Sequence, residues 1–310
     1  MRMVGWGLSL ALLISLMVGS AGAQAETPGS GIFVTDTGSC RIWRMNDMTR
    51  AGWTSLDIQS PVCQSPAGET FPFYPGAIFV DGTGRIYLTD AFSPRIARMD
   101  DMAGTGWTTL SGFRGSTPYQ FELPHGIFVD RAGRIYIADG VGNSRIVRVN
   151  DMTGAGLVTL GTQGSGVNQF IQPEGIFVDG AGRIYIADLG NDRVVRVDNM
   201  TGAGWVTLGS NRPAGIYVDG VGRIYVAETG FSCRVVRVND MTGVGRVAFG
   251  TVGYGVNQFN GPMGIAVDSA GRIYVADSGN NRLVRIDNMT GAGWITESHQ
   301  FKAPQGVFVR

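Results

Sequence analysis

One segment recurs six times along this chain of 310 residues, and this recurrence constrains the fold more than any other feature. Its clearest copy reads Pro-Met-Gly-Ile-Ala-Val-Asp-Ser-Ala-Gly-Arg-Ile-Tyr-Val-Ala-Asp over residues 262–277. Pro-x-Gly starts, or Pro-Gly-Ala in the first case, lie at Pro75, Pro124, Pro173, Pro213, Pro262 and Pro304, so the spacings are 49, 49, 40, 49 and 42 residues. A repeat of this size is one supersecondary unit that buries its apolar face by stacking on its neighbours.

Each complete copy contains four β-type runs separated by turns. In the copy that begins at Pro173 the runs are 175–179, 183–188, 193–198 and 205–208. β-branched and aromatic residues dominate the runs, whereas Gly, Asp and Asn fill the breaks. Four antiparallel strands in ~45 residues are typical of one propeller blade. We therefore predict an all-β fold over residues 26–310, a six-bladed β-propeller of four-stranded antiparallel blades.

The two ends of the chain complement each other. The first copy starts late, because residues 31–36 match the second run of the repeat rather than the first. The missing inner strand appears at the other end, in residues 304–310. The C-terminal strand is therefore predicted to join the N-terminal blade, which closes the ring and removes two exposed sheet edges.

These motifs resemble the NHL repeat. The resemblance rests on Pro-x-Gly-Ile-x-Val-Asp, on Gly-Arg-Ile-Tyr-Val-Ala-Asp with the Asn-x-Arg after it, and on the lead-ins at 164–173 and 253–262. It extends over nearly all of the chain after the first thirty residues and implies a six-bladed NHL propeller. The connector Asp-Asn-Met-Thr-Gly-Ala-Gly-Trp is longer than the hairpin that NHL repeats often have there, which suggests an elaboration of one face.

The first residues have the pattern of a signal peptide. Residues 4–18 are apolar apart from small residues and Ser, and Ala21-Gly22-Ala23 offers a cleavage site, so we expect residues 1–25 to be removed. The apolar run is shorter than a membrane span needs, and no later run is long enough, so we expect an exported, periplasmic or extracellular, monomeric chain.

The 25 basic and 25 acidic residues leave no basic excess for a nucleic-acid partner.

Three cysteines occur, and an oxidising compartment would permit one disulfide. Cys40 and Cys63 belong to the same repeat region, whereas Cys233 lies four repeats away from Cys40. We favour a Cys40–Cys63 pair with Cys233 unpaired, although spacing alone leaves the connectivity open.

Residues that recur between copies are interpreted as scaffold. Tyr in the second run, Met after the third and Trp at the start of the fourth are assigned to packing between blades and in hairpins. The tyrosines are Tyr87, Tyr136, Tyr185, Tyr225 and Tyr274, and the methionines are Met48, Met102, Met152, Met200, Met241 and Met289. The tryptophans are Trp53, Trp107, Trp205 and Trp294.

A carboxylate that ends the second run and an Arg five or six residues later also recur. The pairs are Asp90 with Arg95, Asp139 with Arg145, Asp188 with Arg193, Glu228 with Arg234, and Asp277 with Arg282. We interpret each as a structural pair across a loop rather than a catalytic carboxylate.

Residues that differ between copies are better candidates for a site. Chain direction places the blade-to-blade loops, the Pro-x-Gly starts and the loops between the second and third runs on one face, here called the loop face. The Asp-Gly turns and the Met-Thr-Gly connectors lie on the other, the turn face. The x of Pro-x-Gly enters the central channel, and its occupants are Gly76, His125, Glu174, Ala214, Met263 and Gln305.

His125 and Glu174 therefore lie on neighbouring blades. An imidazole beside a carboxylate can form an acid/base pair or half of a metal site, and the alternative is a polar rim that binds water. Gln305 is expected on the blade next but one beyond Glu174, which is too distant for it to complete a compact cluster. His299 is expected to be an exposed loop residue.

Propeller enzymes that resemble this repeat offer no residue-by-residue match. Peptidyl-amidoglycolate lyases hold zinc with several channel histidines, whereas this chain has one at such a position. Gluconolactonase-type propellers hold calcium with Glu, Asn and Asp at inner-strand ends, and here only Glu174 fits. Virginiamycin-B-lyase-type propellers need a channel His and Glu, which His125 and Glu174 match loosely.

Two hypotheses follow. The first is a binding scaffold that holds a protein, peptide, glycan or small ligand on the loop face and in the channel, with no cofactor. Its candidate contacts are His125, Glu174, Gln305, Tyr74, Tyr119, Phe121, Asp192, Arg212, Phe231 and Tyr254. The alternative is a lyase or lactone hydrolase centred on His125 and Glu174, with Ca²⁺ or Zn²⁺ as the possible metal. The incomplete catalytic set favours binding, since a fold alone does not imply chemistry.

Overall fold

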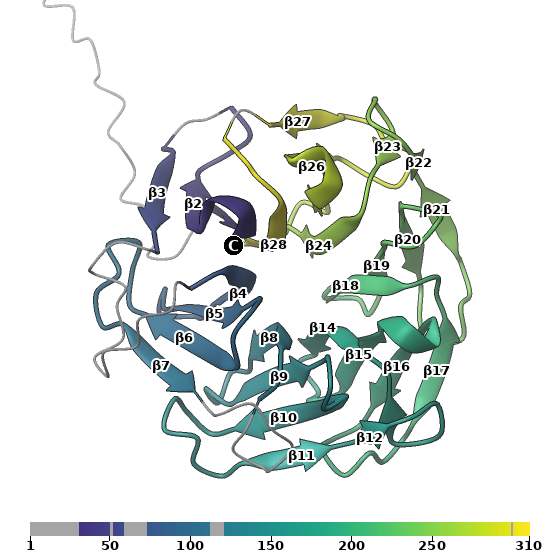
Figure 1. Cartoon of the computed structure of the whole chain (residues 1–310). Helices are drawn as coiled ribbons and strands as arrows, with labels where there is room; N and C mark the ends of the chain where they lie inside the picture. The colour runs from purple at the N-terminus through teal and green to yellow at the C-terminus, as the bar shows by residue number, and fades with distance from the viewer. Residues whose placement is uncertain (1–30, 50–51, 59–72, 112–120, 299) are drawn as a thin grey trace, which may run out of the picture.

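Six four-stranded antiparallel sheets surround a central axis in the computed structural model of this chain (Figure 1). The structure describes residues 31–49, 52–58, 73–111, 121–298 and 300–310. The predicted signal peptide, residues 1–25, lies outside the described residues, as do Cys63, Tyr119 and His299. The prediction of an all-β six-bladed propeller is confirmed.

Blade 1 combines the two ends of the chain, with β28 (Pro304–Val309), β1 (Ile32–Asp36), β2 (Arg41–Met45) and β3 (Thr54–Asp57). Blade 2 has β4 (Pro75–Val80), β5 (Ile86–Asp90), β6 (Arg95–Met99) and β7 (Thr108–Ser111). Blade 3 has β8 (Pro124–Val129), β9 (Ile135–Asp139), β10 (Arg145–Val149) and β11 (Val158–Leu160).

Blade 4 has β14 (Pro173–Val178), β15 (Ile184–Asp188), β16 (Arg193–Val197) and β17 (Val206–Gly209). Blade 5 has β18 (Pro213–Val218), β19 (Ile224–Glu228), β20 (Arg234–Val238) and β21 (Val247–Phe249). Blade 6 has β24 (Pro262–Val267), β25 (Ile273–Asp277), β26 (Arg282–Ile286) and β27 (Ile295–Glu297).

Short elements shape the loops of the loop face. Two parallel two-stranded pieces precede blades 4 and 6, β12 (Thr162–Gln163) with β13 (Gln169–Phe170) and β22 (Thr251–Val252) with β23 (Gln258–Phe259). Single 3₁₀ turns follow the second strand of three blades, namely η1 (Thr37–Ser39), η3 (Leu189–Asn191) and η4 (Ser278–Asn280). Within the described part of the chain, no helix is long and apolar enough to cross a membrane.

Ring closure by the C-terminal strand is confirmed. β28 pairs antiparallel with β1, with Phe308 opposite Phe33 and Val307 opposite Val34. β28 also contacts the inner strands on both sides, β24 of blade 6 and β4 of blade 2. In Figure 1, β28 accordingly lies at the axis beside β24 and β4. Both edges of the open ring are therefore covered.

The repeated apolar residues form the core between blades, as predicted. The second strand of every blade is buried along its whole length, because it has a neighbouring strand on each side and a neighbouring blade on each face. The five repeat tyrosines are only 3 or 4% exposed. Met48, Met152, Met200, Met241 and Met289 are buried as well, and Met102 packs against the core between blades 1 and 2.

The glycine of Pro-x-Gly sets how closely the inner strands approach. A Cβ on Gly215 would lie 2.3 Å from the carbonyl oxygen of Met263, and one on Gly126 would lie 2.4 Å from that of Glu174. The missing side chain therefore lets one inner strand pack directly on the backbone of the next blade. This close approach brings the six x positions together at the mouth of the channel.

Candidate functional site

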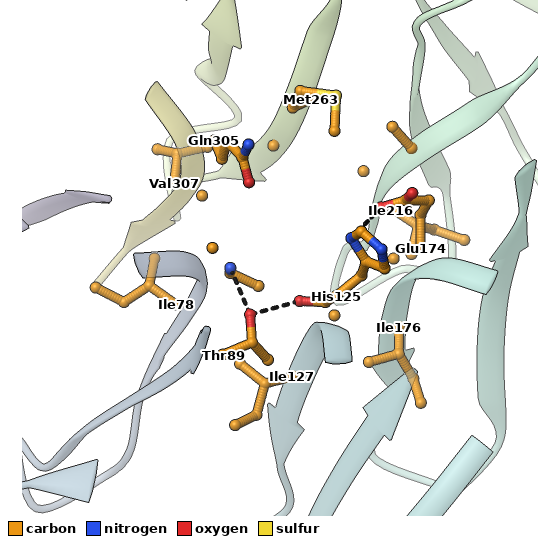
Figure 2. Close-up of a pocket in the computed structure, with 18 of the residues that line it drawn as sticks. Ile78, Thr89, His125, Ile127, Glu174, Ile176, Ile216, Met263, Gln305 and Val307 are labelled. Atoms are coloured by element: carbon orange, nitrogen blue, oxygen red, sulfur yellow. Dashed lines mark hydrogen bonds and ion pairs between the residues drawn. The ribbon is translucent and has the colours of Figure 1, made fainter. Parts of the chain in front are cut away.

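The six variable x residues converge at the loop-face end of the channel, where they line a cavity of about 120 Å³ here called the channel mouth. Figure 2 shows His125 and Glu174 on one side of it, with Met263 and Gln305 across from them. A ring of branched side chains, two residues further along each inner strand, lines the same cavity. Its members are Ile78, Ile127, Ile176, Ile216, Ile265 and Val307.

His125 and Glu174 form the one ion pair of the channel mouth among the described residues. Because β8 and β14 are neighbouring inner strands, the Nδ1 atom of His125 lies 3.0 Å from the Oε2 atom of Glu174. The two side chains are 23% and 14% exposed. The structure therefore brings together the two residues that the sequence analysis singled out.

Gly140 makes room for the imidazole. It follows β9, and a Cβ at this position would lie 2.6 Å from the Cδ2 atom of His125. The other blades have Thr37, Ala91, Leu189, Thr229 and Ser278 at the corresponding position. The Nε2 atom of His125 is buried on this side and has no hydrogen-bond partner among the described residues. The blade that carries the histidine is thus the one that lacks a side chain beside it.

Glu174 favours the charged form of His125. Burial works against the imidazolium, but the nearby carboxylate of Glu174, assisted by the more distant Asp139, outweighs it and raises the pKa of His125 above the ordinary 6.5. A raised pKa in the folded state adds stability that is complete below the unfolded pKa and is lost as the pH rises through the folded pKa.

The melting temperature of the protein should therefore depend on pH through His125. We expect the difference in melting temperature between the native chain and His125→Gln to be larger at pH 6 than at pH 9, by roughly 2–4 °C, the change that ~1 kcal/mol produces in a domain of a few hundred residues. Differential scanning calorimetry at both pH values measures it. When Glu174→Gln is present in both chains, the effect of His125→Gln on the melting temperature should no longer depend on pH. If the effect in the native chain is the same at both pH values, Glu174 does not favour the charged form of His125.

Two threonines organise the channel mouth and were missed by the sequence analysis. Thr89 on β5 donates a hydrogen bond of 2.8 Å to the carbonyl of His125 and accepts one of 2.8 Å from the amide of Ala77 (Figure 2). Thr35 on β1 makes the corresponding contacts to the carbonyl of Gly76 and the amide of Gly306. Both threonines occupy a position where the other four copies have Ala. This departure from the repeat was the feature of the sequence that could have identified them.

Comparison with family models identifies the repeat. Residues 121–149 and 259–286 match the model described as "NHL repeat". Together with the six four-stranded blades, these matches support an NHL-repeat propeller. The chain is a six-bladed β-propeller with NHL repeats. Comparison with curated protein sequences gives no match.

Solved structures similar to this NHL propeller are also propellers in shape but distant in sequence. The nidogen/laminin complex contains a chain with a TM-score of 0.67 and 20% identity, covering 89% of this chain and 96% of that one. An inactive H270A virginiamycin B lyase from Staphylococcus aureus, solved with quinupristin, has a TM-score of 0.58 and 14% identity, with 91% and 89% covered. A protein of unknown function from Bacteroides caccae has a TM-score of 0.61 and 15% identity, with 89% and 97% covered. At these identities the likeness shows the fold alone.

The repeated carboxylate–Arg pairs of the NHL propeller cross their loops as expected. The Nε atoms of Arg95, Arg193 and Arg282 lie 2.7, 2.8 and 2.7 Å from buried aspartates, and the other two pairs are at 3.1 and 2.7 Å. Burial raises the pKa of these aspartates, although hydrogen bonds from the turn amides and the arginines oppose it. Each carboxylate is fully buried beneath its loop and turned away from the channel mouth.

A metal fits the channel mouth poorly. Among the described residues, no three His, Cys, Asp or Glu side chains gather closely enough to hold an ion. His125 and Glu174 supply two ligating groups, but Nδ1 of His125 already contacts Glu174 and Nε2 is buried. Structural zinc takes four ligands and calcium six to eight oxygens. The Ca²⁺ or Zn²⁺ that the enzyme alternative would use therefore lacks a ligand set here.

Four of the predicted loop contacts are exposed, and Tyr74 is half-buried. Phe231 and Tyr254 are 96% and 78% exposed on the loop face. Asp192 and Arg212 are exposed neighbours, since the amide of Arg212 donates a hydrogen bond of 2.8 Å to the Asp192 carboxylate. Tyr74 is half-buried and packs edge-on against Phe92, with ring centroids 5.0 Å apart.

Two predictions about this face are wrong. Phe121 is not a surface contact, because it is 2% exposed and packs in the core between blades 2 and 3. Gln305 does reach the channel mouth, but it lies three inner strands from Glu174, directly across the channel, rather than two. Gln305 lies on β28 of blade 1, so the inner strands of blades 5 and 6 separate it from Glu174 on blade 4.

Proposed function

We propose that this protein is a binding propeller that holds a protein or peptide ligand on its loop face, with one polar group of the ligand in the channel mouth. One observation carries the proposal. The three aromatic side chains that are exposed among the described residues, Phe92 (57%), Phe231 (96%) and Tyr254 (78%), all lie in loops of this face. Exposed aromatic residues grouped on one face are typical of interaction surfaces.

The size of the channel mouth supports an extended ligand over a small one. Its volume of about 120 Å³ is well below the ~300–1,000 Å³ of pockets that enclose drug-sized molecules. It can admit a single side chain or chain terminus, which His125, Glu174 and Gln305 would meet with polar groups. Export to the periplasm or the cell exterior is part of the same proposal, and rests on the signal-peptide pattern of residues 1–25.

A displayed peptide library selected on the purified protein tests the proposal. Binding of the selected peptides, measured by biolayer interferometry, should weaken at least tenfold in Phe231→Ala/Tyr254→Ala, since truncation of an aromatic anchor typically costs ~2 kcal/mol. Val221→Ala is the matched control, because Val221 is 78% exposed but lies on the turn face. Selected peptides that are insensitive to the double variant would contradict a loop-face site.

An acid/base enzyme of the lyase or lactone hydrolase type is the second candidate, and the 3.0 Å contact between His125 and Glu174 is the observation that favours it. Plasma mass spectrometry of the native chain, His125→Ala and Glu174→Ala separates the two functions. Stoichiometric calcium or zinc that is lost in either variant, with turnover of a lactone that Glu174→Gln abolishes, would replace the binding proposal.

A further inference from the structure

The turn face carries a second and larger hollow, on the opposite end of the channel. It consists of two adjoining parts of about 1240 and 1040 Å³, which share Asp219, Gly220 and Val221 and are here together called the vestibule. Its walls are the Asp-Gly turns between the first and second strands of blades 2 to 6. None of the residues that line the vestibule lines the channel mouth.

Aromatic rings form a horseshoe around the channel axis, and four of them, Phe79, Phe128, Phe177 and Tyr217, line the vestibule. The rings of Phe308, Phe79, Phe128, Phe177 and Tyr217 come from five successive inner strands, with neighbouring centroids 5.1, 4.8, 5.0 and 5.2 Å apart. All five side chains are only partly buried. The sixth inner strand has Ala266 at this position, so the ring of aromatic residues is open on one side.

Tyr217 adds one polar group beside this opening. Tyr217 lines the vestibule, and its hydroxyl has no hydrogen-bond partner among the described residues. The five repeat tyrosines differ, because each donates its hydroxyl proton to the aspartate of its own turn. Burial, together with the negative charges of Asp219 and Asp268, raises the pKa of Tyr217, so the phenol remains a hydrogen-bond donor.

Arginines form the rim, and each is bonded to its aspartate through Nε. In each of blades 2 to 6 the Nε atom of the turn arginine lies 2.6 to 2.8 Å from the Oδ2 atom of the turn aspartate. No terminal guanidinium nitrogen of these five side chains has a hydrogen-bond partner in the described residues, and the side chains are 39–44% exposed. They are Arg85, Arg134, Arg183, Arg223 and Arg272.

The side chains of the rim carry an excess of positive charge. With Arg131 and Arg310, seven arginines and five aspartates line the vestibule. The aspartates are engaged within their own turns. One carboxylate oxygen accepts hydrogen bonds from the turn amides, and the other accepts one from Nε of the arginine. Hydrogen bonds from the turn and the arginine outweigh burial and lower the pKa of Asp81, Asp179 and Asp268, so these carboxylates stay ionised and fully engaged. A ligand therefore meets guanidinium donors at the rim.

We propose that the vestibule binds a small anionic aromatic molecule. Its ring would stack on the aromatic horseshoe, where offset and edge-to-face contacts between rings are favourable. Its anionic group would accept hydrogen bonds from the free edges of the rim arginines, whose planar donors match carboxylate and sulfonate oxygens. The hydroxyl of Tyr217 would give a further donor next to the gap at Ala266. Cationic aromatic molecules are disfavoured by the same rim.

A matched pair of fluorescent probes tests the charge and the ring together in the native protein. 8-Anilinonaphthalene-1-sulfonate carries the sulfonate, and N-phenyl-1-naphthylamine has the same rings without it. We expect the sulfonate to bind with one-to-one stoichiometry and at least tenfold more tightly than the neutral probe, with an affinity that falls as salt is added. Equal affinity for the two probes would overturn the proposal.

Variants then place the probe in the vestibule. Phe177→Leu/Tyr217→Leu removes two rings but keeps both positions apolar, and Arg223→Gln removes one rim charge. Each variant should weaken sulfonate binding at least fivefold. Arg41→Gln is the matched control for Arg223→Gln, because both side chains are 41% exposed and both pair with an aspartate, but Arg41 lies on β2 outside the vestibule. Loss of probe binding in Phe231→Ala/Tyr254→Ala instead would place the probe on the loop face and refute the vestibule site.

Discussion

A chain that stops after Ala303 is expected to lose its cooperative thermal transition, or to melt at least roughly 15 °C below the full chain, since each ~1 kcal/mol is worth about 2–4 °C at this size. The deletion removes β28, which forms the inner strand of blade 1 and contacts both neighbouring inner strands. It leaves β1 as an exposed edge and removes Phe308 from beside Phe79. Circular dichroism at 218 nm on heating measures the transition (the wavelength is about that of the β-sheet minimum).

A permuted chain is the control for this deletion. The ends of β28 and β1 are adjacent, because the amide of Gly31 donates to the carbonyl of Arg310 at 3.0 Å and the amide of Arg310 donates back at 3.1 Å. Residues 301–310 can therefore precede residue 31 through a two-residue Asn-Gly turn, which gives blade 1 a local hairpin. This chain should melt within a few degrees of the native one. A deletion that melts like the full chain, or a permuted chain as unstable as the deletion, would show that closure is not what stabilises the ring.

Asp277→Ala is expected to give the second largest effect, a loss of about 3–5 kcal/mol in the free energy of unfolding. Asp277 is fully buried and accepts hydrogen bonds from the amide of Asn260, the side chain of Asn280 and Nε of Arg282, at 2.7, 2.8 and 2.7 Å. The substitution leaves all three donors without their partner and Arg282 as a buried unpaired charge. Urea unfolding followed by tryptophan fluorescence gives the free energy.

The matched control is Asp287→Ala in the same blade. Asp287 pairs with Arg285 at 3.2 Å, but its side chain is 45% exposed, so the loss should stay below about 1 kcal/mol. Similar losses for the two variants would mean that the loop pairs of the propeller are no more than surface ion pairs.

The fold was predictable because the same pattern of strands and turns recurs along the chain. A fixed slot for Tyr, Met or Asp in successive copies marks the same structural position in successive blades, and the missing first strand at residue 31 could be matched to its replacement at 304. The contact between His125 and Glu174 followed from the same register, since equivalent positions on neighbouring inner strands meet at the axis.

The rest depended on geometry that residue type does not reveal. Phe121 was taken for a surface contact because its loop differs between copies, yet it is buried between blades. The vestibule was missed because no prediction was made for the position that Phe128 and Phe177 occupy on the inner strands. Their rings are only partly covered. Departures from the repeat at Tyr217 and Ala266 were the signal that could have drawn attention to this face.

The closing strand also has a consequence for biosynthesis. Blades 2 to 6 are each built from one continuous stretch of chain, so each can form its hairpins as it leaves the ribosome. Blade 1 cannot, because β1 to β3 are made first and β28 is made after every other strand. During translation the nascent chain therefore carries an unpaired strand edge from the start, and only its last strand covers it. This edge of β1 therefore stays open to chaperones until residues 304–309 have been made.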